Sequence, residues 1–252
     1  MEAHVLDLAI ARAWPAREEV PIGPWTARLD AGVTRRPNSV LPHGHGPPPD
    51  TGVMDDWLRI VLRLYRRRGL TPWIQVTGAA WPPGLERELE ARGWETGIDR
   101  TLLLTGAVPA AGSELDVRLA SRPQHSWIET WWSVDARGGA LQRESAAALL
   151  ARIGEPAAFA SVIVDGACAG VALGVVVDGL LVLECIATRP EVRRSGVARA
   201  AIGALGRWAA ERNATGTLLA VQEANAPARA LYEALGFEQT SSYAYARPAE
   251  RD

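Results

Sequence analysis

The sequence predicts an α/β fold, of the α+β kind, in which helices flank a central sheet. Apolar runs separated by Asp165-Gly166 and Asp178-Gly179 are typical of strands joined by tight hairpin turns. The last of these runs leads through a short basic loop into an alanine-rich amphipathic segment, which is the pattern of a strand, a loop and a helix. A helix–strand–helix order that closes on glycine and an aromatic residue occurs twice, at Gly93-Trp94 and at Gly236-Phe237. This repetition predicts two similar halves.

Composition limits the class of protein. The 252 residues are 48% apolar with a net charge of −2, which fits one large or two small domains. Near-balanced charge argues against a nucleic-acid partner, and no apolar stretch is long enough to span a membrane. Glu2 and Asp7 interrupt any signal-peptide pattern, so a cytoplasmic location is expected. Cys168 and Cys185 lie in apolar runs and are expected to be reduced core residues.

The first half is expected to span residues 1–108. Helices are predicted where apolar residues recur at helical spacing, at 5–13, 53–68 (capped by Gly69) and 85–92. Strands are predicted at 25–30, 33–41 and 71–77, the first two forming a possible hairpin around Ala31-Gly32. Residues 42–50 are rich in glycine and proline and predict a loop.

The second half is expected to span 115–252 after a linker at 109–114. Small residues and Pro109 between Gly106 and Gly112 predict that linker. Helices are predicted at 124–136, 141–153 and 197–212. Strands are predicted at 115–119, 159–164, 167–177, 180–188, 217–222 and 241–247.

The basic loop before residue 197 is suited to a pyrophosphate. The first N–H groups of a helix have no intrahelical partner and lie at the positive end of its dipole. Glycine lets a ligand approach the backbone, a small residue avoids crowding it, and two arginines add charge. A solvated basic turn is the simpler alternative. The loop residues are Arg193, Arg194, Ser195, Gly196, Val197 and Ala198.

Two motifs in this order resemble the GNAT superfamily of acyl-CoA-dependent N-acetyltransferases. The phosphate-loop motif is matched by Arg193, Gly196 and Ala198. A later signature is matched by Asn225, Ala228, Tyr232, Gly236 and Phe237. The resemblance covers about Leu115 to Pro248. It implies two GNAT-like domains, each with a mixed, mostly antiparallel central sheet flanked by helices.

The first half departs from the family pattern where the coenzyme would bind. The counterpart of its phosphate loop falls near Pro49 to Val53, which has Gly52 and no arginine. The counterpart of its tyrosine falls near Glu88 or Leu89. We therefore expect a degenerate half that does not hold acyl-CoA. A chance alignment of two helix–strand–helix runs is the alternative reading.

The resemblance implies that acetyl-CoA is the co-substrate and that an amine accepts the acetyl group. In this reading the end of a strand, at Ile186, Ala187 and Thr188, offers backbone groups to the pantetheine. Asn225 hydrogen-bonds the pantetheine as well, although a loop-forming role is the alternative. The residues of the basic loop, 193–198, hold the diphosphate.

Tyr232 and Glu184 are the candidate catalytic residues. The resemblance places the Tyr232 phenol near the thioester sulfur, where it supplies a proton to the leaving thiolate; a helix tyrosine that packs on Phe237 is the alternative. Glu184 is a candidate base, because strand alternation puts it on the side of Ile186; a strand glutamate paired with an arginine is the alternative. No stronger base is evident, which mildly favours an α-amine acceptor.

Aromatic and histidine residues give weaker signals. Trp127, Trp131 and Trp132 suit either the core or a wall of the acceptor cleft. His43 and His45 lie in a loop without supporting cysteines or a nearby carboxylate, so no metal site is expected.

Three functions remain open from the sequence. The first is an acetyltransferase for a small or amino-acid-like amine, which reacts by direct attack in a ternary complex. The second is a non-catalytic acyl-CoA sensor or interaction module on the same fold. The third is a protein or peptide acetyltransferase. The oligomeric state is open as well.

Overall fold

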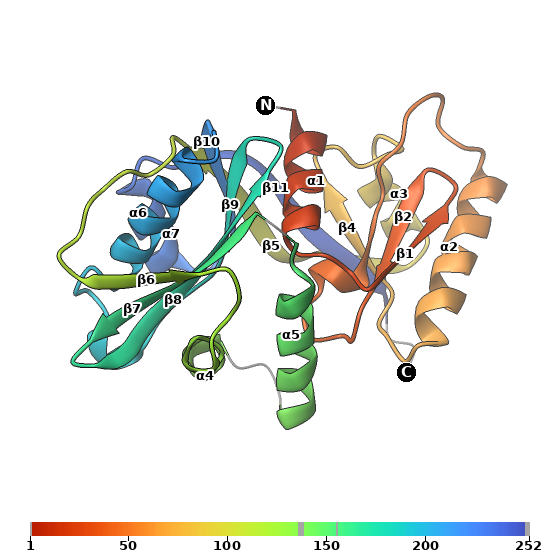
Figure 1. Ribbon diagram of the computed structural model, residues 1–252. Coiled ribbons are helices and arrows are strands. Elements are labelled where there is room, and N and C mark those ends of the chain that lie inside the picture. Colours follow the sequence, from red (N-terminus) through yellow and green to blue (C-terminus); the bar gives the residue numbers. More distant parts are fainter. Residues whose placement is uncertain (1, 136–138, 155, 250–252) are drawn as a thin grey trace. The chain divides into compact units, whose positions relative to one another are not determined.

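The computed structural model describes residues 2–135, 139–154 and 156–249 (Figure 1). The chain divides into two compact units. The first unit consists of Met1–Leu103, Val221–Ala226 and Gln239–Asp252, and the second of Leu104–Ala220 and Pro227–Glu238. Among the described residues, no helix is both long and apolar enough to traverse a bilayer.

The first unit contains a mixed sheet. Its strands follow the order β1-β2-β3-β4-β11-β5. β1 pairs with β2, β2 with β3 and β4 with β11 in antiparallel fashion, whereas β3 and β4 are parallel. The strands are β1 (Glu18–Ile22), β2 (Trp25–Leu29), β3 (Ser39–Leu41), β4 (Trp73–Thr77), β5 (Trp94–Gly106) and β11 (Glu238–Pro248).

β2 and β3 are antiparallel neighbours, but the predicted hairpin turn around Ala31-Gly32 is wrong, because residues 30–38 separate the two strands. β2 and β3 pair from Thr26 to Leu41 and from Ala27 to Val40. The 3-10 helix η1 (Arg36–Asn38) occupies the middle of the segment predicted as strand. Pro37 within that segment has no N–H to give to a neighbouring strand, which explains why the strand begins only at Ser39.

The described part of the first unit contains the α-helices α1 (Ala3–Ala13), α2 (Thr51–Arg66) and α3 (Leu85–Ala91). α2 buries Met54, Leu58, Val61 and Tyr65, which recur every three or four residues. The chain turns away after it at Gly69, whose φ is +66°. The predicted helices are confirmed to within a turn at their ends, and residues 42–50 form no regular structure, as predicted.

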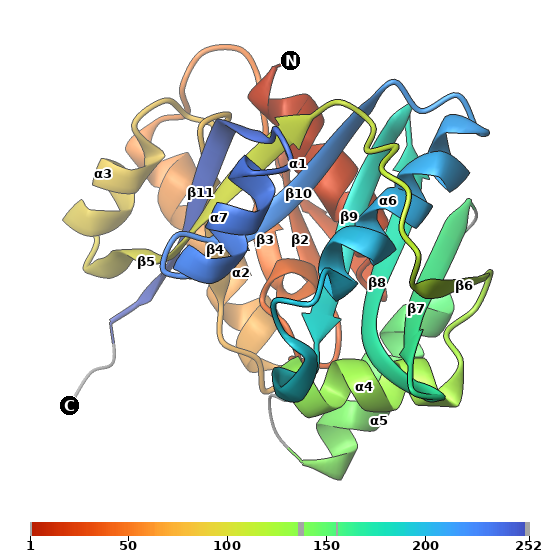
Figure 2. The same cartoon turned by 90° about the vertical axis from the view of Figure 1, so that its left-hand side faces the viewer.

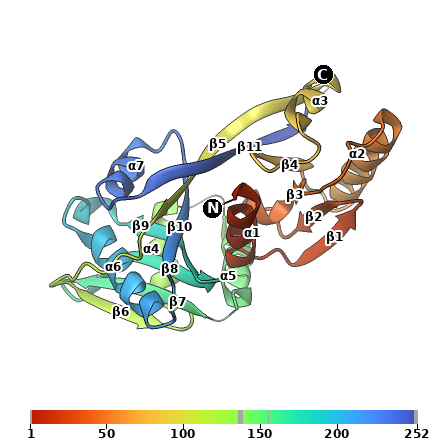
Figure 3. The same cartoon turned by 90° about the horizontal axis from the view of Figure 1, so that it is seen from above.

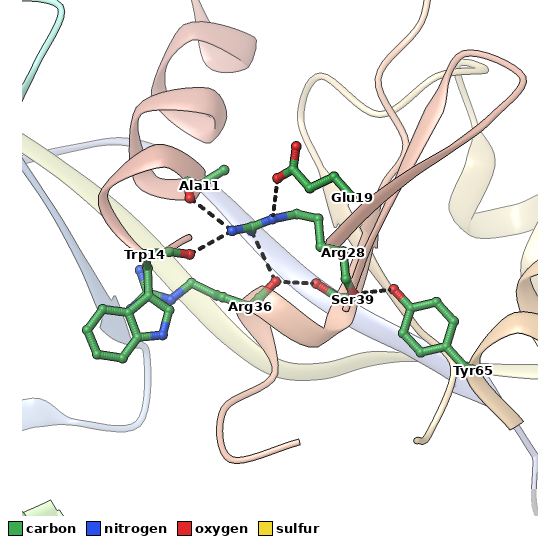
Figure 4. A network of polar contacts seen from close by, with 7 residues as sticks. All are labelled: Ala11, Trp14, Glu19, Arg28, Arg36, Ser39 and Tyr65. Carbon is green, nitrogen blue, oxygen red and sulfur yellow. Dashed lines mark hydrogen bonds and ion pairs between the residues drawn. The ribbon is translucent and has the colours of Figure 1, made fainter. Parts of the chain in front are cut away.

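A buried arginine ties α1 to β2 (Figure 4). The Arg28 guanidinium donates to the carbonyl oxygens of Ala11 at 2.9 Å, Trp14 at 2.7 Å and Arg36 at 3.1 Å. Burial lowers the pKa of Arg28, and the nearby Glu19 carboxylate opposes that shift. The guanidinium therefore satisfies carbonyl groups at the end of α1 that the helix itself leaves unpaired.

The second unit contains strands in the order β10-β9-β8-β7-β6. β10 and β9 are parallel, and the remaining neighbours are antiparallel. The two Asp-Gly turns are confirmed as hairpins, with positive φ at both residues of each pair. The strands are β6 (Asp116–Ala120), β7 (Ala157–Val164), β8 (Ala167–Val177), β9 (Leu180–Thr188) and β10 (Gly216–Gln222), the last two residues of which fall in the first unit.

Helices cover both faces of these strands (Figures 1 and 3). α6 packs on one face, and α4 lies on the other, where its own Trp127 and Trp131 are buried. The Trp127 ring meets Phe159 edge-on at 5.3 Å, so these two tryptophans are core residues, while Trp132 is half-buried. The helices are α4 (His125–Asp135), α5 (Ala140–Arg152), α6 (Val197–Ala210) and α7 (Ala226–Glu233); Ala136, predicted to end α4, lies outside the described residues.

The segment predicted as a linker packs along α6. A side chain at Gly206 would place its Cβ 1.7 Å from the Pro109 carbonyl oxygen, and one at Gly203 would place it 2.3 Å from that of Ala111. Arg207 donates to the same Ala111 oxygen at 2.6 Å. The two glycines therefore admit the chain against the helix. The division into domains at 109–114 stays a prediction.

Candidate active site

The strand before the basic loop carries a bulge. β9 pairs with β8 through Glu184 to Leu173 and Ala187 to Val171, so one extra residue of β9 lies between these pairs. Cys185 adopts a φ of +52° there. Because the bulge interrupts the two-residue period, strand alternation does not relate Glu184 to Ile186, and the use of alternation to orient Glu184 was wrong.

The basic loop turns sharply between β9 and α6 (Figure 2). The 3-10 helix η2 (Pro190–Val192) precedes it, and both Arg194 and Gly196 have positive φ, at 67° and 83°. The Ser195 hydroxyl donates to the Val192 carbonyl at 2.6 Å. Residues 193–196 are all exposed. The loop is therefore held by its own contacts while its backbone and both arginines face solvent.

α6 begins with free helical amides. Gly196 is its N-cap, no side chain caps it, and the first helical bond runs from Ala200 N to Gly196 O at 2.9 Å. The N–H groups of residues 197–199 therefore have no partner within the helix, which is the arrangement that binds anions. The half-buried Ala198 adds little bulk at this end.

A glycine on β8 fixes the position of this helix end. Val197 is buried against Gly170, where an added Cβ would lie 2.3 Å from Val197 Cγ1 and 3.0 Å from the Ala187 carbonyl oxygen. Only glycine therefore lets α6 approach β8 and β9 this closely. Of the neighbouring β9 residues, Ala187 is buried and Ile186 and Thr188 are half-buried.

Tyr232 on α7 and Glu184 on β9 lie within electrostatic range of each other in the second unit. Burial raises the pKa of the Tyr232 phenol well above its usual range, and the Glu184 carboxylate raises it further. Both side chains are 7% exposed. The phenol therefore stays protonated at neutral pH and is a hydrogen-bond donor.

Tyr232 also packs on Phe237. The two rings lie 6.0 Å apart at 66°, and Phe237 N donates to the Tyr232 carbonyl at 3.0 Å. Gly236 between them has a φ of +81°, which explains the glycine of this motif. The Tyr232 side chain therefore both packs on Phe237 and interacts electrostatically with Glu184.

Asn225 belongs to the first unit. It lies in the turn between β10 and α7, and its N–H donates to the Gln222 carbonyl at 2.9 Å. Its assignment to the pantetheine remains a prediction, as do the other assigned roles.

Sequence reasoning missed one contact beside the loop. The Arg189 guanidinium, directly after β9, donates to the Thr130 hydroxyl on α4 at 3.4 Å. That hydroxyl donates to the Cys168 carbonyl on β8 at 3.2 Å. The contact joins residues 59 positions apart, so no local pattern announces it.

The two loop histidines lie in the first unit. His43 Nε2 is 3.1 Å from Asp7 Oδ2, while His45 is exposed. Within the described ranges, no group of three or more histidine, cysteine, aspartate or glutamate side chains is arranged to hold a metal ion.

The chain is similar in sequence to known proteins along nearly its whole length. A family model described as "Probable histone acetyltransferase Rv0428c C-terminal" matches residues 2–246. An uncharacterized N-acetyltransferase, YobR of Bacillus subtilis, is 24% identical over 247 residues, covering 95% of this chain and 96% of its own.

Solved structures share the fold. A GCN5-related N-acetyltransferase from Kribbella flavida has a TM-score of 0.74 at 17% identity, covering 99% of this chain and 96% of its own. A tandem GNAT protein of the clavulanic acid biosynthesis pathway has a TM-score of 0.65 at 16% identity, covering 85% and 76%. The predicted fold class, a mixed α/β fold with a mostly antiparallel sheet flanked by helices, is confirmed, while the division into two GNAT-like halves stays a prediction.

Proposed function

From the premise that the chain belongs to the family described as "Probable histone acetyltransferase Rv0428c C-terminal", a family of GNAT N-acetyltransferases, we propose that its second unit moves an acetyl group from acetyl-CoA to an amine. The chain is an acyltransferase. The identity of the co-substrate, the class of the acceptor and the role of each residue are parts of the proposal.

One observation carries it. The exposed loop at residues 193–196 leads into a helix whose first amides are uncapped, and the same unit places Tyr232 near Glu184. The amides and the two arginines are suited to a diphosphate. Residues 186–188 at the end of β9 then lie along the pantetheine.

The reaction is a direct attack in a ternary complex. The neutral amine nitrogen attacks the thioester carbon, the C–S bond breaks, the nitrogen loses a proton and the thiolate gains one. The products are the acetamide and free coenzyme A. Glu184 takes the amine proton, directly or through water, and Tyr232 donates to the sulfur.

Tyr232 assists late in the reaction. Its pKa is raised by burial, so full proton transfer before C–S cleavage is unfavourable. Even an unshifted phenol is a weaker acid than a thiol by about 2 kcal/mol. A hydrogen bond that strengthens as charge develops on sulfur stabilises the transition state without prior transfer.

The acceptor is proposed to be an α-amine of a small or amino-acid-like molecule. Deprotonation at pH 7 costs about 1.4 kcal/mol for an α-amine and about 4.6 kcal/mol for a lysine-type amine. A single carboxylate base is better matched to the smaller of these two deprotonation costs, that of the α-amine. The description of the matching family favours a second candidate, a lysine of a protein or peptide.

Two measurements test the function. Calorimetry with coenzyme A measures binding, and free-thiol release measures turnover on a panel of amino acids, small diamines and lysine-containing peptides. We expect coenzyme A binding that weakens about tenfold when Arg193 and Arg194 are both changed to Gln, because two charge-assisted contacts are lost. The exposed Arg122, changed to Gln, is the matched control.

Absence of coenzyme A binding would overturn the proposal. Turnover of lysine-containing peptides alone would show that the acceptor is a lysine of a protein or peptide and not an α-amine. Coenzyme A binding without turnover of any amine would indicate that the unit is instead a non-catalytic acyl-CoA sensor.

A further inference from the structure

The strand β6 forms a free edge of the second unit. It ends the strand order of that unit and lies at the outer margin of its strands, beside β7 (Figure 2). All five of its residues pair with β7, from Asp116 with Ile163 to Ala120 with Phe159. The backbone groups of an antiparallel strand point alternately to its two sides. Within the described ranges, the groups of β6 that point away from β7 meet no other strand, so they can pair with one from outside the chain.

Neither a proline nor a bulge interrupts this edge. β1, the edge strand of the first unit, contains Pro21, which has no N–H to donate to a further strand. β6 contains no proline, and its register with β7 continues without a shift over all five pairs. Leu115 N donates to the Ser113 hydroxyl at 3.1 Å, so the free stretch begins at Asp116. The edge is therefore regular from Asp116 to Ala120.

The charges on β6 are complementary to one another. Asp116 and Arg118 lie two residues apart, so their side chains share one face of the strand. Arg118 donates to Asp116 Oδ2 from Nη2 at 2.7 Å and from Nε at 3.0 Å, and both side chains are more than half exposed. Among the described residues, Asp116 Oδ1 and Arg118 Nη1 have no hydrogen-bond partner. Each side chain can therefore keep this contact and accept a second partner of opposite charge.

A second copy of β6 matches these charges in one symmetric antiparallel register. When the two-fold axis passes through Val117, Asp116 of each copy lies opposite Arg118 of the other, and the four charges alternate in sign. When the axis passes through Asp116 or through Arg118 instead, two like charges face each other. The favoured register does not depend on which residues of β6 have outward-pointing backbone groups, because Val117 can face itself in either kind of antiparallel pair.

The apolar residues of β6 fit the same register. Val117 and Leu119 lie on the face opposite the charged side chains, and so does Leu115, which directly precedes the strand, if the alternation extends to it. The register places Leu115 of each copy opposite Leu119 of the other and the two Val117 side chains opposite each other. Leu119 is 40% exposed although it is large and apolar. Pairing therefore covers apolar surface on one face while it joins opposite charges on the other.

We propose that β6 is an interaction surface for a second copy of this chain, with the two β6 strands paired antiparallel about Val117. The strands of one second unit then continue across the interface into those of the other. A five-residue strand makes a small interface, so we expect a reversible dimer with a Kd on the order of 10 µM. The inference rests on β6 alone and does not depend on the proposed transferase function.

Reversal of the charges tests the register. Sedimentation velocity measures the mass of the full chain over a range of concentrations around the expected Kd. Arg118→Asp and Asp116→Arg each place like charges opposite each other, and we expect each to weaken self-association about tenfold. The double variant exchanges the two charges and restores the affinity to within about threefold. Arg59→Asp is the matched control, because Arg59 is an exposed arginine that pairs with Asp56 on α2, and it leaves self-association unchanged.

A cysteine cross-link tests the position of the axis. Val117→Cys places two introduced thiols opposite each other, at the Cα separation of about 5 Å of an antiparallel pair, which a disulfide can span. We expect mild oxidation to give a covalent dimer on a non-reducing gel. Leu119→Cys is the control, because its two thiols lie about 14 Å apart along the paired strands. The unaltered chain, which contains Cys168 and Cys185, is oxidised in parallel and stays uncross-linked.

Several results overturn the proposal. The first is a chain that remains monomeric at about ten times the expected Kd. The others are unchanged self-association in Arg118→Asp, a double variant that associates no better than the single variants, and an Arg59→Asp variant that dissociates as Arg118→Asp does. Cross-linking of Leu119→Cys as readily as Val117→Cys overturns it as well. Circular dichroism establishes that each variant is folded, and the cross-link, which needs only a small side-chain change, decides the question if charge reversal unfolds the chain.

Discussion

The Glu184 carboxylate on β9 lies close enough to the Tyr232 phenol on α7 to raise its pKa beyond the effect of burial alone. Two buried side chains from different elements of one unit therefore interact electrostatically. A base and a proton donor are the pair that amine acetylation requires.

Tyr232→Phe separates the donor role from the packing role. The change removes the hydroxyl and keeps the ring that lies 6.0 Å from Phe237. We expect turnover to fall about 100-fold, as is typical when a positioned proton donor is lost. Coenzyme A affinity, measured by calorimetry, stays nearly constant. Equal turnover of both proteins in the thiol-release assay rules out the donor role.

Tyr232 also predicts part of the pH profile. Because its folded-state pKa is raised above the unfolded value near 10, the phenol remains protonated in the folded protein throughout the neutral and mildly alkaline range. Its contribution to stability is complete below about pH 10 and is lost only as the pH rises toward the folded-state pKa. We expect the unaltered enzyme and Tyr232→Phe to have kcat profiles of the same shape up to about pH 9. An alkaline decline below pH 9 that is absent from Tyr232→Phe contradicts this.

Glu184→Gln tests the base. The amide has nearly the same volume and does not accept a proton, so we expect turnover at pH 7 to fall at least tenfold. The deficit shrinks as the pH rises toward 9, because a larger fraction of the acceptor amine is then neutral without help. Parallel rate–pH curves for the two enzymes, with a constant deficit, point to a structural effect instead.

Gly170→Ala tests how the start of α6 is positioned. The new Cβ lies 2.3 Å from Val197 Cγ1, so the helix end has to move. We expect coenzyme A affinity to fall about tenfold although no ligand contact is replaced. Gly154→Ala is the control, because nothing lies within 4 Å of a Cβ at that exposed position and its backbone suits alanine. Unchanged affinity in Gly170→Ala means that the helix end yields without cost.

Arg28→Met tests the buried network of the first unit. The methionine fills similar space and leaves the carbonyl groups of Ala11, Trp14 and Arg36 without their donor (Figure 4). We expect a loss of about 3 kcal/mol in the free energy of unfolding, measured in urea, since removal of one partner of a buried ionic network costs this much. A loss below about 1 kcal/mol indicates that water replaces the guanidinium. The surface change Arg17→Met provides the comparison.

Strong local signals in the sequence predict most of the elements. Asp-Gly pairs, helical spacing and glycine stops lie within a few residues of the structure they specify. β1 was not predicted, because it is largely exposed and contains Pro21. β5 was not predicted either, since its first seven residues, 94–100, are mostly polar and exposed. Pairing with neighbours, rather than its own pattern, makes such a segment a strand.

Local signals in the sequence likewise predict only part of the candidate site. The basic loop and Tyr232 were predicted as site residues because each belongs to a motif within a short stretch of chain. The bulge at Cys185 was not, since a change of pairing register depends on β8 as much as on β9. The contact between Asp7 and His43 joins residues 36 positions apart, and neither residue type indicates it alone.

The pairing of β11 with β4 has a consequence for biosynthesis. β11 follows the whole second unit in the chain but hydrogen-bonds to a strand of the first. A ribosome that synthesises this chain from its amino end therefore exposes an incomplete sheet from the emergence of β4 until β11 follows, and that half reaches its native form only after residue 248 has left the exit tunnel.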